Sequence, residues 1–208
     1  MSKLTVVVAG SLLVLGAVAA GCGSSGSSGS APVTVTLFSD PGLDGTAGTL
    51  NFSSSAGLPT AGDNGAQAFQ GFVSFDLSTL PPGAVVISAT VTVAQVFVFG
   101  DPYADHGVVV LDHVDYGDVL DSSDYGTPSL TADVGVASSD SSIGATLIDA
   151  TAEVAADLAA ARTRSQFRLR FSLLDTDGDA TADQALFEDG EDSNGSGMVP
   201  TLEVTYQL

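Results

Sequence analysis

Short runs of alternating apolar residues recur from residue 31 to residue 208, each bounded by Gly, Pro, Asp or Ser. A period of two is typical of a β-strand with one buried face. Several such runs without long helices between them are typical of a sandwich rather than of a parallel α/β sheet. The sequence therefore predicts an all-β fold over residues 31–208, an antiparallel β-sandwich of jelly-roll-like form. The predicted strands are residues 33–37, 72–77, 85–99, 107–114, 166–174, 185–188 and 201–206.

Residues 166–174 have the clearest strand pattern. Because side chains alternate across a strand, one set is expected in the core. That set is Phe167, Leu169, Phe171 and Leu173. Arg168 and Arg170 fall on the opposite face, which is predicted to be solvated.

One short helix is predicted, over residues 150–164 or so. The residues expected on its buried face are Val154, Leu158 and Ala161. Asp149 or Thr151 can cap its first turn. Arg162 and Arg164 suit the negative end of the helix dipole.

The first thirty residues predict export and attachment. Residues 1–21 combine an early Lys, an apolar run and a small-residue ending, which is typical of a signal peptide. The ending before Cys22 resembles a bacterial lipobox, so Cys22 is the expected lipidation site. Residues 22–30 are then a flexible Gly/Ser tether. The alternative is a conventional secretory signal with an incidental Cys. The expected location is the cell envelope, with the protein lipid-anchored at the outer membrane or cell surface.

The charge balance excludes some partners. The chain has 5 basic and 25 acidic residues and a formal net charge of −20. Binding to nucleic acid or to an anionic lipid surface depends on clustered Lys and Arg, so neither is expected. Contact with a membrane is therefore expected through the lipid anchor alone. A single Cys also excludes a disulfide framework within the chain.

The folded part carries a series of motifs at strands and turns: residues 62–64 (GDN), 71–84 (GFVSFDLSTLPPGA), 87–90 (ISAT), 162–171 (RTRSQFRLRF), 175–183, 187–188 and 200–206 (PTLEVTY). These motifs resemble those of DNRLRE-type domains, which are secreted, carbohydrate-binding-like β-sandwich modules related to those of disaggregatases. The resemblance spans about residues 33–208. It implies a β-sandwich that contacts carbohydrate, and no site residue is carried over from it.

An acidic turn is the strongest candidate metal site. Carboxylates at alternate positions on a tight turn converge, and calcium takes six to eight oxygen ligands. The candidate ligands of a structural Ca²⁺ are Asp175, Asp177, Asp179, Asp183 and, from the next loop, Glu188. The alternative is an exposed acidic turn that binds no ion.

The segment 101–125 is a candidate sugar site, because tyrosine rings can stack on sugar C–H surfaces while carboxylates accept hydroxyl protons. The candidate residues are Tyr103, Tyr116, Tyr125, Asp105 and Asp115. The alternative is tyrosine packing at the edge of the sandwich, with the acidic residues in water.

No pattern of residues predicts catalysis: the chain has no G-x-S-x-G or H-E-x-x-H motif, and its only Cys is assigned to lipid. The sequence favours a non-catalytic lipoprotein whose β-sandwich contacts a neutral or calcium-bridged extracellular polysaccharide. A structural or adhesion module that binds an envelope protein and no sugar is the alternative. A hydrolase is a third, less supported hypothesis.

Overall fold

The computed structural model describes residues 30–208, apart from residues 56 and 174. The predicted signal peptide over residues 1–21, the lipid-modified Cys22 and the Gly/Ser tether up to residue 29 lie outside these described residues. Within the described part of the chain, neither α-helix has the length and apolar character needed to cross a membrane.

Antiparallel strands are the predominant secondary structure of this part, which confirms the predicted all-β sandwich. The strands are β1 (Val33–Phe38), β2 (Gly45–Gly48), β3 (Phe52–Ser54), β4 (Thr60–Asp63), β5 (Ala68–Asp76), β6 (Val85–Phe99), β7 (Val109–Val114), β8 (Thr131–Ser138), β9 (Gly144–Asp149), β10 (Arg164–Phe171), β11 (Asp183–Phe187) and β12 (Thr201–Gln207). The helical elements are α1 (Pro102–Asp105), the 3-10 helix η1 (Ser122–Gly126) and α2 (Thr151–Ala159).

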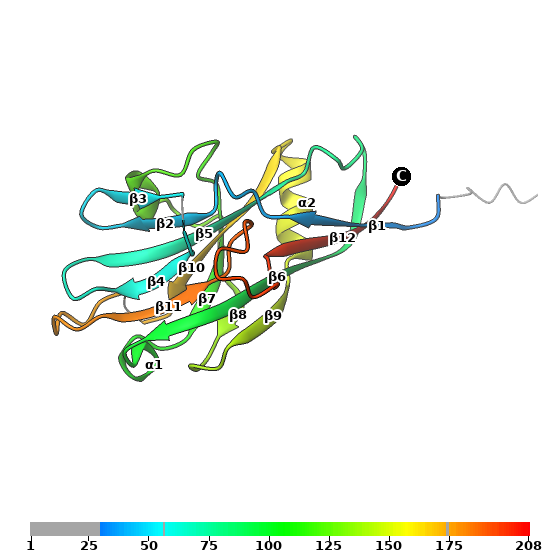
Figure 1. Cartoon of the computed structure of the whole chain (residues 1–208). Coiled ribbons are helices and arrows are strands. Elements are labelled where there is room, and N and C mark those ends of the chain that lie inside the picture. Colours follow the sequence, from blue (N-terminus) through cyan, green and yellow to red (C-terminus); the bar gives the residue numbers. More distant parts are fainter. Residues whose placement is uncertain (1–29, 56, 174) are drawn as a thin grey trace, which may run out of the picture.

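The strands form one hydrogen-bonded sheet that folds back on itself into two layers (Figure 1). One layer contains β3, β2, β5, β10, β7 and β8. The other contains β1, β12, β6, β11 and β4, with β9 on the other edge of β6. The layers meet where the β4–β5 hairpin pairs Asp63 with Ala68. Residues of both layers, such as Phe167 and Leu202, belong to one hydrophobic core.

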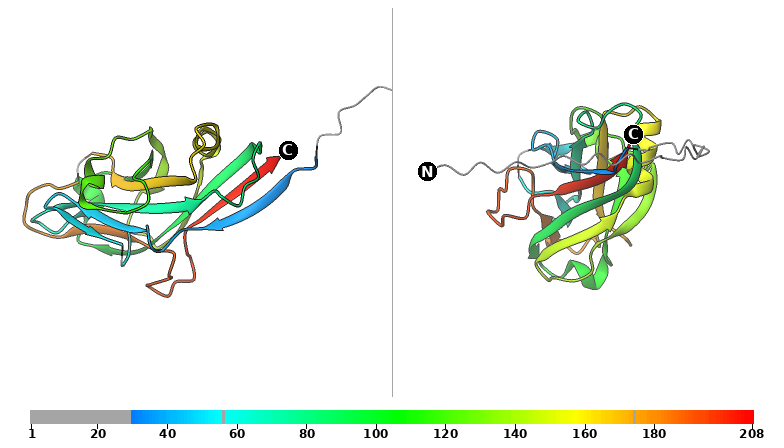
Figure 2. Two further views of the ribbon diagram at one scale, coloured as in Figure 1. Left: turned by 90° about the horizontal axis from the view of Figure 1, so that it is seen from above. Right: turned by 90° about the vertical axis from the view of Figure 1, so that its right-hand side faces the viewer.

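The two ends of the described chain lie together at one end of the sandwich. The Ser30 hydroxyl donates to the Leu208 carbonyl, and the Leu208 N–H donates to Ser30 Oγ, both at 2.9 Å. Figure 2 shows β1 and β12 running side by side toward this end. Helix α1 lies at the opposite end (Figure 1).

Strand β10 confirms most of the predicted core. Phe167, Leu169 and Phe171 are buried between the layers. The prediction for Leu173 was wrong, because β10 ends at Phe171 and the Leu173 side chain is 72% exposed.

The prediction that Arg168 and Arg170 form a solvated face was also wrong. Both lie on the face opposite the core, but the segment that follows β7 covers that face. Arg168 is buried, and both guanidinium groups donate to Asp112, with 2.7 Å from Arg168 Nη2 and from Arg170 Nε to Asp112 Oδ2. A second hydrophobic cluster, which includes Phe72 and Tyr116, lies under the same cover.

Helix α2 confirms the predicted helix but is shorter. It spans Thr151–Ala159, with Val154 buried. Ala161 lies beyond its end with a φ of 55°, so it is not on the helix face. Asp149 accepts a hydrogen bond from the Thr151 N–H at 3.0 Å. Arg162 follows the helix and donates to Asp157 and Asp115, whereas Arg164 begins β10.

Candidate cation site and aromatic surface

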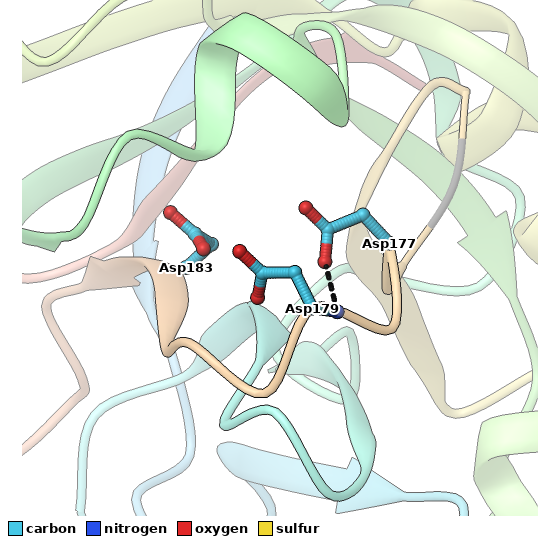
Figure 3. Close-up of side chains that lie close together, drawn as sticks. All are labelled: Asp177, Asp179 and Asp183. Atoms are coloured by element: carbon cyan, nitrogen blue, oxygen red, sulfur yellow. Dashed lines mark hydrogen bonds between the residues drawn. The ribbon is translucent and has the colours of Figure 1, made fainter.

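Three of the predicted metal ligands come together where the loop after β10 leads into β11. Asp177, Asp179 and Asp183 each offer a carboxylate oxygen, and these oxygens lie within 4.8 Å of one another. Asp177 and Asp179 are exposed, and the Asp179 N–H donates to Asp177 Oδ1 at 3.0 Å (Figure 3). This cluster of carboxylates can hold a metal ion.

The other two predicted ligands are engaged elsewhere. Asp175 Oδ2 accepts hydrogen bonds from Gln70 Nε2 and from the Tyr125 hydroxyl, both at 2.8 Å. Glu188 is fully buried and accepts a hydrogen bond from the Asn194 N–H at 3.0 Å. This bond joins the two sides of the loop that follows β11. Neither belongs to the cluster of three carboxylates.

Asp183 is the fixed member of the cluster. It is the first residue of β11, is 8% exposed, and accepts the Asp101 N–H at 2.6 Å. Gly100 has a φ of +65°, and a Cβ there would lie 2.2 Å from Asp183 Oδ1. The backbone before α1 can therefore approach this carboxylate closely only because residue 100 is glycine.

Two titratable side chains that the sequence analysis missed lie beside this cluster. Asp63 and His106 are fully buried, with 3.9 Å between His106 Nε2 and Asp63 Oδ2. His106 caps the C-terminus of α1, and its ring packs on Phe171 with centroids 5.3 Å apart. Asp63 ends β4 and lies opposite Asp183 in the sheet. Nothing in the sequence links these positions, because the pairing of strands alone brings them together.

The structure does not bring the predicted sugar-binding tyrosines together. Tyr103 packs on Phe171, and its hydroxyl is within hydrogen-bond distance of Gln95 Oε1 and of Ser138 Oγ, the latter at 2.9 Å. Tyr116 is buried on Phe72, and its hydroxyl donates to the Leu43 carbonyl at 3.1 Å.

The remaining members of that set are equally dispersed. Tyr125 donates to Asp175, as described above. Asp105 is an exposed residue of α1, and Asp115 accepts from Arg162 Nε at 3.1 Å. The set therefore divides among two hydrophobic clusters and separate surface positions, because β7 runs through the middle of the segment.

His113 and Asp157 form a buried pair that joins β7 to α2. His113 Nε2 lies 3.0 and 2.9 Å from the two carboxylate oxygens of Asp157, and the side chains are 2% and 0% exposed. Arg162 Nη1 also donates to Asp157, at 3.1 Å. Shielded from solvent in this way, the pair braces the helix against the sheet.

A row of aromatic residues crosses the sheet, and the sequence analysis missed it. Directly opposite residues in neighbouring strands place their side chains on the same side of a sheet. From β6 through β11, β4, β5 and β2 to β3, the opposed residues are Phe99, Gln184, Gly62, Phe69, Gly48 and Phe52. Phe97 lies beside Phe99, with ring centroids 4.6 Å apart. We call Phe52, Phe69, Phe97 and Phe99 the phenylalanine face.

The two ends of the phenylalanine face are accessible to solvent, whereas Phe69 between them is only 6% exposed. Phe52, Phe97 and Phe99 are 38%, 45% and 47% exposed. The strands that carry it follow one another down the left half of Figure 1, from β3 to β6. At about 4.8 Å per strand, the row from Phe52 to Phe99 is about 24 Å long when measured along the sheet, which bends between β4 and β5.

A hollow of ≈ 190 Å³ lies within this face. Phe52 and Phe69 line one part of it, with ring centroids 5.5 Å apart and an edge-to-face arrangement. Leu58, Gly57 and four polar residues line the rest: Thr46, Ser54, Thr60 and Gln184. Ring faces beside hydroxyl and amide groups can contact a ligand that has both C–H surfaces and hydroxyls.

A β-bulge directs two of these phenylalanines outward. Leu186 of β11 lies opposite Phe97, but the next residue, Phe187, lies opposite Gln95, which leaves Val96 as an extra residue in β6. Simple alternation from Val93 would place Phe97 in the core. The extra residue reverses that direction, which is the usual consequence of a bulge.

Comparison of the chain with protein-family models and with curated proteins found no match.

Proposed function

We propose that the protein is a non-catalytic, surface-anchored lipoprotein whose β-sandwich contacts extracellular polysaccharide through the phenylalanine face. The observation that carries this proposal is the row of exposed rings on β3 and β6 on either side of a hollow lined by Gln184 and Thr60. Aromatic rings stack on the C–H faces of sugars, and amide and hydroxyl groups pair with sugar hydroxyls. The motif resemblance to DNRLRE-type modules supports the same function.

A neutral polysaccharide is the expected ligand class. The chain carries a formal net charge of −20, so an anionic polymer is repelled unless cations bridge it to the surface. The described residues around the hollow carry aromatic, aliphatic, hydroxyl or amide groups, or in Gly57 no side chain, and none of them is a cationic residue that could bind a uronate.

We further propose that the carboxylates of Asp177, Asp179 and Asp183 hold a structural divalent cation. Their ligand atoms are all oxygens, which is the donor set that calcium favours. A bound ion relieves the repulsion among three adjacent carboxylates and stabilises the folded state by mass action.

Removing rings from the phenylalanine face is expected to weaken polysaccharide binding. The full-length protein is tested on a glycan array and by affinity electrophoresis in neutral polysaccharides, with and without calcium. Each ring that stacks on a sugar contributes about 1 kcal/mol, so Phe97→Ala and Phe99→Ala should each weaken binding about five- to tenfold.

The matched control is Phe38→Ala, which removes a phenylalanine that is 63% exposed on β1 and lies outside the phenylalanine face. An equal loss in this variant contradicts the assignment of the face. A blank array in both conditions, together with recovery of a single envelope protein in a pull-down, favours the adhesion module instead.

The anchor is tested separately. Mass spectrometry of the protein purified from membranes is expected to show Cys22 as the first residue, with a mass increase from attached acyl chains. Several chains are needed, because one chain holds a protein to a membrane only marginally. A mature N-terminus at another residue, or an unmodified Cys22, contradicts the anchor and leaves polysaccharide binding untouched.

A further inference from the structure

The acidic loop between β10 and β11 is one side of a larger cluster of titratable side chains at the α1 end of the sandwich. We call the two sides of this cluster the outer and the inner wall. The outer wall consists of Asp177, Asp179 and Asp183. The inner wall consists of Asp63 and His106, which the fold buries completely. Figure 3 shows the three loop carboxylates beneath the coil of α1, the helix whose C-terminus His106 caps.

The inner wall lacks the hydrogen bonds that buried polar groups normally make. Among the described residues, neither ring nitrogen of His106 has a hydrogen-bond partner, and nor does Asp63 Oδ2. Most buried polar atoms in proteins are paired, so three unpaired atoms on two neighbouring side chains point to a missing ligand.

The spacing of these atoms suits a shared ion. His106 Nε2 and Asp63 Oδ2 are 3.9 Å apart, which is too far for a hydrogen bond. Two ligands of one metal ion, each at about 2.0–2.4 Å from it, stand about 3–4.5 Å apart. The other oxygen of Asp63 accepts the Gly65 N–H at 2.8 Å, which holds the carboxylate in place.

Two observations connect the inner wall to the outer one. Asp63 lies directly opposite Asp183 across the β4–β11 pair, so their side chains share one side of the sheet. The chain just after Asp63 also lies against the acidic loop, because a Cβ at Gly65 would stand 2.4 Å from the carbonyl carbon of Ala180. The two walls therefore face the same space.

We propose that Asp63 and His106 complete the cation site of Asp177, Asp179 and Asp183, and that this mixed site binds Zn²⁺ more tightly than Ca²⁺. The inference rests on the proposed cation site and changes its expected ion. The loop alone supplies oxygens, whereas the inner wall adds an imidazole nitrogen. Imidazole is a preferred ligand of zinc and a poor ligand of calcium.

Such a site links parts of the chain that are far apart in sequence. The ion joins the end of β4, the turn after α1 and the β10–β11 loop through Asp63, His106 and Asp179. Binding draws the exposed carboxylates of the loop toward the buried pair and fixes the α1 end of the sandwich.

The test is calorimetric titration of the full-length, metal-free protein with Zn²⁺ and with Ca²⁺, together with NMR of the imidazole nitrogens. One Zn²⁺ is expected per chain, bound more tightly than Ca²⁺. The chain has only two histidines. Zinc should shift the ring nitrogen signals of His106 and leave those of His113 unchanged, because the His113 ring is buried elsewhere with its Nε2 paired to Asp157. His106→Gln should weaken Zn²⁺ binding about 10–100-fold and Ca²⁺ binding much less.

Asp118→Asn is the charge-matched control for Asp179→Asn, because the Asp118 side chain is 90% exposed outside both walls. Asp179→Asn should weaken both ions, and Asp118→Asn neither. Tighter binding of Ca²⁺ with unmoved His106 signals overturns the inference but keeps a calcium site in the loop. Binding of neither ion overturns both cation proposals and leaves the polysaccharide proposal intact. If His106→Gln does not fold, the ring nitrogen shifts of the unmodified protein decide.

Discussion

Replacing Asp112 with Ala is expected to lower the free energy of unfolding by about 3–5 kcal/mol, because it leaves the buried Arg168 guanidinium without a carboxylate and leaves Arg170 with only the exposed Asp133. Asp112 is fully buried and accepts from Arg168 and Arg170. It also accepts from the Ser129 hydroxyl and the Asp133 N–H, both at 2.9 Å. Burial alone would raise the pKa of Asp112, but the hydrogen bonds from Arg170 and Arg168 outweigh it and lower that pKa to about 2.

Asp133→Asn is the control for this prediction, because Asp133 has a φ of 54°, a backbone conformation that Asn tolerates and Ala does not. The Asp133 carboxylate also accepts from Arg170, at 2.8 Å, but its side chain is 64% exposed. An exposed pair contributes about 0–1 kcal/mol, so this variant should unfold at nearly the same urea concentration as the unmodified protein. Equal midpoints for the two variants in urea denaturation would show that Asp112 is no more important than a surface carboxylate.

Raising the pH from 5 to 8 is expected to destabilise the protein through Asp44. Its carboxylate is 1% exposed and accepts the N–H groups of Ser74 and Gly190, each at 3.0 Å. Burial raises its pKa from 3.8 to about 7, and the nearby Asp189 contributes to the rise. The folded state therefore holds a proton that the unfolded state has already released. The contribution of Asp44 to the free energy of unfolding is fully present below about pH 4 and is lost as the pH rises toward and through 7. About 2–3 kcal/mol of this loss falls between pH 5 and pH 8.

Urea denaturation at the two pH values measures this effect, with Asp44→Asn as the test variant. The amide can still accept from the Ser74 N–H but loses the hydrogen bond from the Gly190 N–H, which changes the stability of the variant at every pH. The quantity to compare is therefore the change in the free energy of unfolding between pH 5 and pH 8. That difference should be much smaller in Asp44→Asn and unchanged in Asp118→Asn, which removes an exposed carboxyl group. If Asp44→Asn loses as much stability between pH 5 and pH 8 as the unmodified protein does, the pH dependence comes from other groups.

Strong hydrophobic alternation was enough to predict the central strands. Residues 85–99 were predicted as one strand, and β6 has those bounds. The core residues Phe167, Leu169 and Phe171 were predicted for the same reason. Strands β2 and β4 were not, because their sequences, GTAG and TAGD, consist of small or polar residues. Such segments become strands only because longer neighbours such as β5 supply hydrogen-bonding partners.

The burial of Arg168 could not be predicted from alternation. Periodicity says which side of a strand a residue occupies, but not whether another segment covers that side. Here the cover includes Thr127 and Ser129, which the β10 sequence does not specify; the Thr127 carbonyl accepts from Arg168 Nη1 at 2.8 Å.

In the candidate sites, too, the sequence predicts residues that are close together in the chain but not those that the fold brings together. The three neighbouring aspartates of the acidic loop were predicted because their spacing lies within one turn. Asp63 and His106 join them only through strand pairing. The phenylalanine face depends on the extra residue Val96, which nothing in the alternating pattern of β6 indicates.

The length of β6 has a mechanical consequence. At Val85 the strand pairs with Gln207, beside the joined ends of the chain, and at Phe99 it reaches the phenylalanine face, about 50 Å away. Under the proposed function, a pull between the tether that precedes Ser30 and a polymer held at Phe99 would pass through β1, β12 and β6, and it would load the hydrogen bonds between these strands in shear. Bonds loaded in shear must break together rather than one after another, so this arrangement would resist drag.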